Sequence, residues 1–215
     1  MPITTMILNL KSINYHIERE TDMELSLVLS GMCKSGMKLI DVVNVFLAPK
    51  SNQGGTMVIE KTYHDVGRLL REVRDFYSPA IEKKGLALVS KVDDGLPKIK
   101  IDREWIYRAL SNLVQNAINY TPVGGMISLN AEFTFNNMLA IQVSDSGCGV
   151  TREEHGKIFH KYYRSAAVKG TKGDGIGLVI VNEVVAAHGG YVELESIVGA
   201  GSTFTMYLPV DPRPA

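Results

Sequence analysis

The chain is organised around one short stretch, Asp145-Ser146-Gly147-Cys148-Gly149-Val150. It follows an apolar run, 138–143, whose alternation predicts a strand. A carboxylate at a strand end can accept a hydrogen bond from an amino group in a pocket. Glycines beside it let the backbone approach a flat ligand closely. Asp-Ser-Gly is also an ordinary turn, so this stretch alone leaves both interpretations open.

Two other stretches carry residue types suited to a nucleotide. Asn112 and Asn116 are four residues apart, so they share a helix face, and amide oxygens suit Mg²⁺. Gly173, Gly175 and Gly177 precede a predicted helix, whose free N–H groups and positive end can hold a phosphate. Taken singly, the two asparagines could be surface amides and the glycine run a flexible loop. The glycine spacing is not a dinucleotide fingerprint, and no Walker lysine follows it.

Composition excludes several classes of function. The 215 residues are 45% hydrophobic and carry no net charge, which gives no reason to expect a nucleic-acid partner. No apolar run approaches the ~20 residues that span a bilayer, and no signal peptide is evident. Cys33 and Cys148 lack metal spacing and are interpreted as free thiols in a reducing cytosol. We expect a cytoplasmic fragment without a membrane partner, although the full-length protein could be membrane-anchored.

Residues 1–47 show the heptad pattern of two amphipathic helices, joined by a polar turn at 18–22. Such a helical hairpin cannot bury both apolar stripes alone, and a homodimeric four-helix bundle would bury them. The alternative is that the hairpin packs on the rest of this chain. Residues 48–55 have linker composition, and we place a domain boundary there.

Residues 56–210 predict a second domain, followed by a tail at 211–215. Asp65 and Asp102 are expected to cap helices ending near residues 84 and 120, and a third helix is expected over 176–188. Strands are expected at 86–92, 126–134, 138–145, 191–196 and 202–208. Helices on one face of such a sheet make an α/β two-layer sandwich, so the whole chain is predicted to be α+β. The stretch 146–174 is expected to include a functional lid.

Five motifs in order resemble the ATP-binding domain of sensor histidine kinases, within the superfamily of type II topoisomerases and chaperone ATPases. They are Asn112–Pro122 (NLVQNAINYTP), Asp145–Gly149 (DSGCG), Ile158–Arg164 (IFHKYYR), Gly173–Leu178 (GDGIGL) and Gly201–Phe204 (GSTF). The resemblance covers residues 56–210. It implies ATP and Mg²⁺ as cofactors, transfer of the γ-phosphate to a histidine, and a response-regulator protein as partner.

The resemblance also implies residue roles. Asn112 and Asn116 would be catalytic, with Asn116 holding Mg²⁺. Asp145 would bind the adenine amino group, while Gly147 and Gly149 shape the base pocket. The other implied nucleotide-binding residues are Asn119, Tyr120, Phe159, Tyr162, Arg164, Gly173, Gly175, Ile176, Gly177, Leu178 and Thr203.

Two positions depart from the family pattern. Asn119 stands where a basic residue is usual, which puts that phosphate contact in question. Asp174 stands where threonine is common, and its negative charge near the phosphate loop would weaken nucleotide binding. Hydrolysing relatives carry a glutamate where this chain has Asn112. An amide cannot take a proton from water, which favours phosphoryl transfer over hydrolysis.

The helical hairpin resembles the dimerisation and phosphoacceptor domain of the same kinases. Pro2-Ile3-Thr4 resembles the end of the acceptor box, so we expect the acceptor histidine immediately before residue 1. The rival acceptor is His16, which lacks the proline that follows the acceptor in that box. Two other functions remain open, an ATPase conformational clamp and a non-catalytic dimer scaffold.

Overall fold

The structure is a computed structural model that describes Gly36 and residues 58–92, 95–134, 136–165 and 175–211. The chain divides into two units, Met1–Gly55 and Thr56–Ala215. Apart from Gly36, all described residues belong to the second unit. The predicted hairpin, the linker at 48–55, His16, Gly173 and Asp174 lie outside the described residues.

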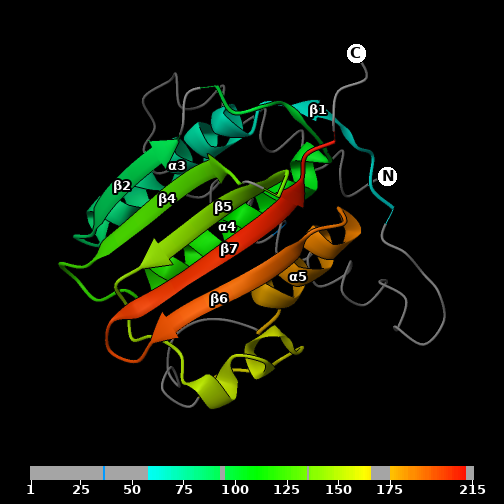
Figure 1. Cartoon of the computed structure of the whole chain (residues 1–215). Helices are drawn as coiled ribbons and strands as arrows, with labels where there is room; N and C mark the ends of the chain where they lie inside the picture. Colours follow the sequence, from blue (N-terminus) through cyan, green and yellow to red (C-terminus); the bar gives the residue numbers. More distant parts are fainter. Residues whose placement is uncertain (1–35, 37–57, 93–94, 135, 166–174, 212–215) are drawn as a thin grey trace. The chain divides into compact units, whose positions relative to one another are not determined.

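A five-stranded sheet forms the centre of the second unit, in the order β2-β4-β5-β7-β6 (Figure 1). Its strands are β2 (Ala87–Val92), β4 (Met126–Phe133), β5 (Met138–Asp145), β6 (Tyr191–Ile197) and β7 (Gly201–Pro209). β2 runs parallel to β4, and the other neighbours are antiparallel. The two hairpins predicted from the sequence are therefore present.

Three helices cover one face of this sheet (Figure 1): α3 (Val66–Lys83), α4 (Arg103–Tyr120) and α5 (Gly177–Ala187). The predicted caps form, because the Asp65 side chain accepts from Arg68 N–H and the Asp102 side chain from Trp105 N–H. Among the described residues, no helix covers the opposite face of the sheet (Figure 1). The α/β two-layer arrangement predicted for this domain is thus confirmed.

The core lies between the helices and the sheet. Alternate strand residues point into it, and the helices bury their apolar stripes there. Its largest fully buried side chains are Leu69, Leu70, Ile81, Ile99, Ile101, Ile106, Leu110, Leu113, Ile127, Leu129, Leu139 and Ile141.

The structure adds two features that the sequence did not predict. A small antiparallel sheet joins β1 (Thr62–His64) to β3 (Ile99–Ile101), beside the start of α4. Two single-turn 3₁₀ helices, η1 (Arg152–Glu154) and η2 (Lys157–Phe159), lie in the stretch expected to be a lid. The described part of that stretch is therefore partly ordered by short helices.

A buried histidine joins three segments near the start of α4. His188, only 3% exposed, follows the last residue of α5. Its Nε2 accepts a hydrogen bond from Asp102 N–H at 2.9 Å, and its Nδ1–H donates to the Val184 carbonyl at 2.7 Å. Asp102 Oδ2 in turn accepts from Glu60 N–H at 3.0 Å. These contacts tie the beginning of α4 to the end of α5 and to the residues before β1.

Candidate functional site

Asp145 stands at the end of β5, half-buried, with its carboxylate turned back on the following loop. Oδ1 accepts a hydrogen bond from Gly147 N–H at 2.8 Å. Burial raises the pKa of this carboxyl, while hydrogen bonds from the backbone of Gly147 and Ser202 act in the opposite direction. A carboxylate has about four acceptor sites. Asp145 therefore retains capacity to accept from a ligand amino group.

The two glycines after Asp145 bring other segments close to it. A Cβ on Gly147 would lie 2.6 Å from the Tyr120 carbonyl oxygen, at the end of α4. Gly149 has φ +70°, and a Cβ there would lie 2.2 Å from the Ile197 carbonyl oxygen, at the end of β6. A residue with a side chain could make neither of these close approaches unless the backbone moved. The loop is thus held between α4 and the β6–β7 turn.

Asn112 and Asn116 lie half-buried on α4. A Cβ on Gly177 would lie 3.4 Å from Asn112 Oδ1, so this part of α4 packs against the first residue of α5. Within the described residues, neither amide side chain has a hydrogen-bond partner. Their oxygens are therefore available to a ligand or an ion beside the start of α5.

The end of α4 is fixed by a residue that sequence reasoning missed. Lys84 Nζ donates to the carbonyl oxygens of Ile118 and Asn119, the latter at 3.2 Å. The Asn119 side-chain oxygen accepts from Gln115 Nε2 at 3.2 Å. The side chain and the backbone carbonyl of Asn119 thus both form hydrogen bonds within the protein. The next residue, Tyr120, borders the Asp145 loop. A lysine just after α3 gives no sequence signal for this contact, which depends on how α3 and α4 pack.

The start of α5 has backbone N–H groups without a side-chain cap among the described residues. Its N-cap, Ile176, has no side-chain capping bond, and Gly177 and Leu178 form the first turn. The first N–H groups of a helix lack partners inside it, and this end carries partial positive charge. Gly175 precedes it with φ +70°. The arrangement suits an anionic group.

The motif at 158–164 lies against the start of α5. Ile158 is buried and Phe159 half-buried, both in η2, which contacts α5. Tyr162 is 58% exposed, with φ +65°, and its N–H donates to the Gly175 carbonyl at 3.0 Å. Arg164 is exposed. The structure thus brings this motif beside the glycines that begin α5.

Thr203 lies on the other side of the sheet from the site. Its hydroxyl donates to Ser144 Oγ at 2.9 Å, and Thr203 pairs with Ser144 in the register of β7 and β5. The neighbour Ser202 pairs with Asp145 and is 8% exposed. Because strand residues alternate between faces, Ser202 is the residue of this motif that shares the face of Asp145. The sequence motif contained both residues but did not fix which one faces the site.

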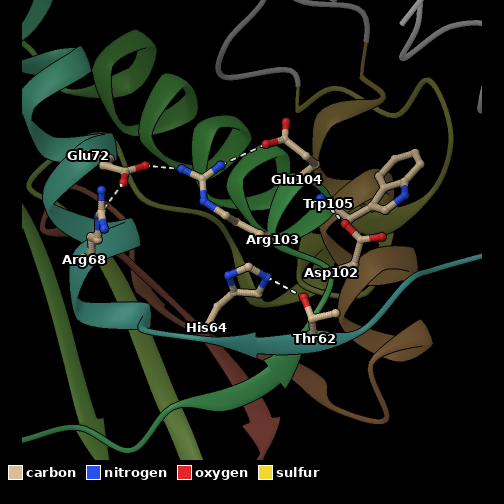
Figure 2. Close-up of polar contacts among 8 residues, drawn as sticks. All are labelled: Thr62, His64, Arg68, Glu72, Asp102, Arg103, Glu104 and Trp105. Atoms are coloured by element: carbon tan, nitrogen blue, oxygen red, sulfur yellow. Dashed lines mark hydrogen bonds and ion pairs between the residues drawn. The ribbon is translucent and has the colours of Figure 1, made fainter.

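A separate polar cavity of about 480 Å³ lies at the opposite end of α4. Figure 2 shows the Glu72 carboxylate between the guanidinium groups of Arg68, at 3.3 Å, and Arg103. The cavity is lined by Tyr63, His64, Asp65, Arg68, Leu69, Glu72, Lys98 and Arg103. The 18 residues of α4 separate its ends by roughly 26 Å, so this cavity is not part of the Asp145 site.

Comparison with known proteins identifies the family. The model of the family described as histidine kinase-, DNA gyrase B- and HSP90-like ATPase matches residues 101–212. The chain belongs to this family. The match includes the five motifs, so the resemblance found in the sequence is confirmed.

Named relatives within this ATPase family are sensor kinases. The chain is 30% identical to the adaptive-response sensory kinase SasA of Crocosphaera subtropica over 169 residues, which cover 79% of this chain and 44% of that protein. It is 32% identical to the alginate biosynthesis sensor protein KinB of Pseudomonas aeruginosa, over 80% of this chain and 29% of that protein. The chain thus spans less than half the length of these relatives.

A solved structure supports the same assignment. The catalytic domain of histidine kinase ThkA aligns with a TM-score of 0.64 and 29% identity, covering 72% of this chain and all of that domain.

Among the described residues, no helix is both long and apolar enough to cross a membrane. Nor do His, Cys, Asp or Glu side chains of the described ranges gather in a metal-binding group of three or more.

Proposed function

We propose that this chain is the catalytic part of a sensor histidine kinase, which binds ATP with Mg²⁺ and transfers the γ-phosphoryl group to a histidine. The observation that carries the proposal is Asp145, a half-buried carboxylate held by Gly147 N–H with acceptor capacity left over. Membership of the ATPase family and the sensor-kinase names of the relatives support it.

Each end of the nucleotide has a counterpart in the site. Asp145 would accept from the adenine amino group, beside Ser202 and the loop carrying Gly147. The phosphates would lie at the start of α5, where backbone N–H groups at Gly177 and Leu178 lack helical partners. Arg164, in the segment held to Gly175, would add positive charge at this end.

Asn116 would hold the metal ion. Its half-buried amide has no hydrogen-bond partner in the described part of the chain, and Asn112 shares its helix face. When bound, Mg²⁺ would neutralise phosphate charge and help orient the phosphoryl group. An amide oxygen is a ligand of the type that Mg²⁺ accepts, so the residues present fit the ion.

The chemistry would be phosphoryl transfer rather than hydrolysis. A neutral histidine nitrogen forms the new bond to the γ-phosphorus, while the bond from this phosphorus to the bridging oxygen breaks and ADP leaves. Asn112 cannot act as a base toward water, so the site would mainly position the reactants and stabilise charge.

Two partners follow from this function. A structure similar to this chain contains histidine kinase ThkA in complex with the response-regulator protein TrrA. A response regulator is therefore the proposed final acceptor of the phosphoryl group. A second copy of this chain is the proposed partner of the hairpin at 1–47. The remaining candidates are an ATPase clamp, which would release phosphate steadily, and a scaffold, which would bind no nucleotide.

The test is nucleotide binding by Asp145→Asn. The substituted amide cannot offer the acceptor pair of a carboxylate, so ATP affinity should fall by about 1.5–3 kcal/mol, or roughly 10- to 150-fold, as for a lost hydrogen bond to a charged group. Calorimetric titration would measure it, with Asp211→Asn, at an exposed position, as control. Equal ATP affinity in wild type and Asp145→Asn would remove Asp145 from the site.

A further inference from the structure

The Glu154 carboxylate accepts hydrogen bonds from hydroxyl groups of the residues that precede and follow Arg164 in the sequence. Its Oε1 accepts a hydrogen bond from the Tyr163 hydroxyl at 2.9 Å, and its side chain accepts another from Ser165. Its Oε2 accepts from the Thr151 hydroxyl at 3.0 Å. The residues before and after Arg164 are therefore attached to one carboxylate, which belongs to the last residue of η1 and also accepts from Thr151, just before η1.

The donors favour the ionised form of this carboxylate. Hydrogen bonds from the hydroxyls of Ser165 and Tyr163 lower the pKa of Glu154 below its usual value. Hydrogen bonds to an ionised acceptor are stronger than those between neutral groups. The hydrogen bonds that attach Tyr163 and Ser165 to Glu154 are therefore of this stronger, charge-assisted kind at neutral pH.

A second set of contacts attaches the same segment to α5. Tyr162 N–H donates to the Gly175 carbonyl, and a Cβ on Gly175 would lie 2.8 Å from the Tyr163 carbonyl oxygen. Lys161 Nζ lies 3.9 Å from Glu183 Oε1 on α5. Arg164 is thus carried by a segment held on one side by Glu154 and on the other by the start of α5.

We propose that Glu154 is a positioning residue for the nucleotide phosphates, which acts by fixing the backbone that carries Arg164. The inference rests on the proposed function, because it requires phosphates at the start of α5. Glu154 does not touch the nucleotide in this scheme. It reduces the number of positions that Arg164 can occupy, so less conformational entropy is lost when Arg164 binds the phosphates.

The test is a double-mutant cycle of Glu154→Ala and Arg164→Ala. Each single variant should weaken ATP binding about three- to tenfold, at the lower end of the coupling seen for neighbouring residues. Glu154→Ala should cause no further loss in the Arg164→Ala background. Adenosine affinity, followed by NMR titration, should be unchanged in all variants, because adenosine has no phosphates.

The chain offers a matched control and a milder variant. Glu153 is the neighbour of Glu154 in η1, is exposed and has no side-chain partner in the described ranges, so Glu153→Ala should retain wild-type ATP affinity. Tyr163→Phe removes one hydroxyl donor and keeps the ring, so it should produce a smaller loss in the same direction. This variant tests the idea even if Glu154→Ala does not fold.

The possible failures are distinguishable. Independent losses from Glu154→Ala and Arg164→Ala in a protein that binds ATP would overturn this inference alone, and so would an equal loss of ATP and adenosine affinity. A wild-type protein without ATP affinity would overturn the proposed function together with the inference.

Discussion

His188 should make the stability of this domain depend on pH in a defined direction. Burial lowers the pKa of His188, with Lys61 acting in the same direction and Asp102 in the opposite one. The side chain is therefore neutral in the folded protein, with its proton on Nδ1. The unfolded chain, whose histidine pKa is about 6.5, binds the proton more readily. The stabilisation by His188 is thus fully present above that value and is lost as pH falls through the lowered folded-state pKa.

The size of the effect follows from the contacts. His188→Ala removes two neutral hydrogen bonds, to Asp102 N–H and the Val184 carbonyl, each contributing about 1 kcal/mol. The Val184 carbonyl keeps its bond from the His188 backbone N–H, but Asp102 N–H loses its partner, at about 1–3 kcal/mol. Because these terms overlap, the free energy of unfolding should fall by about 2–4 kcal/mol at about pH 8.

Urea denaturation at about pH 8 and about pH 5 would measure this dependence, since this range covers the histidine titration. The difference in stability between wild type and His188→Ala should shrink at the lower pH, because protonated His188 can no longer accept from Asp102 N–H. His160→Ala, at an exposed position, is the control and should follow the wild type. An equal difference at both pH values would refute the assignment of His188 as a neutral acceptor.

Two further predictions concern the metal and the oligomeric state. Asn116→Ala should lower magnesium-dependent ATP affinity while leaving adenosine affinity nearly unchanged; if calorimetry and NMR show both falling in a folded variant, Asn116 packs the pocket and holds no ion. The heptad pattern of residues 1–47 predicts a dimer, and charged residues in place of Leu10 and Val28 should produce monomers in light scattering, at a cost of several kcal/mol for unpaired buried charge. A wild-type monomer at micromolar concentration would contradict this prediction.

The sequence predicted the features that depend on local chemistry. The caps at Asp65 and Asp102 need only a side-chain acceptor two or three residues before the N–H group that it binds, so the local sequence indicated them. The strands of the two hairpins were visible because each alternates over several residues and a turn joins neighbouring strands. The helix bounds agree with the structure to within a residue or two.

Features that depend on distant pairing were not predictable in the same way. β1 and β3 have three residues each, too few for a periodic signal, and their paired residues are far apart in the chain. The parallel pairing of β2 with β4 is likewise set by the whole domain. Thr203 shows the same limit at the site, because a shift of one residue in a strand exchanges the faces of the sheet. Only the register of β5 with β7 identifies Ser202 as the residue facing the site.

The glycines of the motifs have a structural role beyond leaving room for a ligand. Gly201 has φ +119°, and a Cβ there would lie 1.9 Å from the Asp145 carbonyl oxygen, so β7 can meet the end of β5 only without a side chain at this position. Gly147 permits a similar approach to the end of α4. A substitution at either glycine would therefore disturb the assembly of the site and lower ligand affinity even if the glycine never touched the ligand. Asp145, whose carboxylate can be changed to an isosteric amide without moving the backbone, gives the more direct measure of adenine recognition.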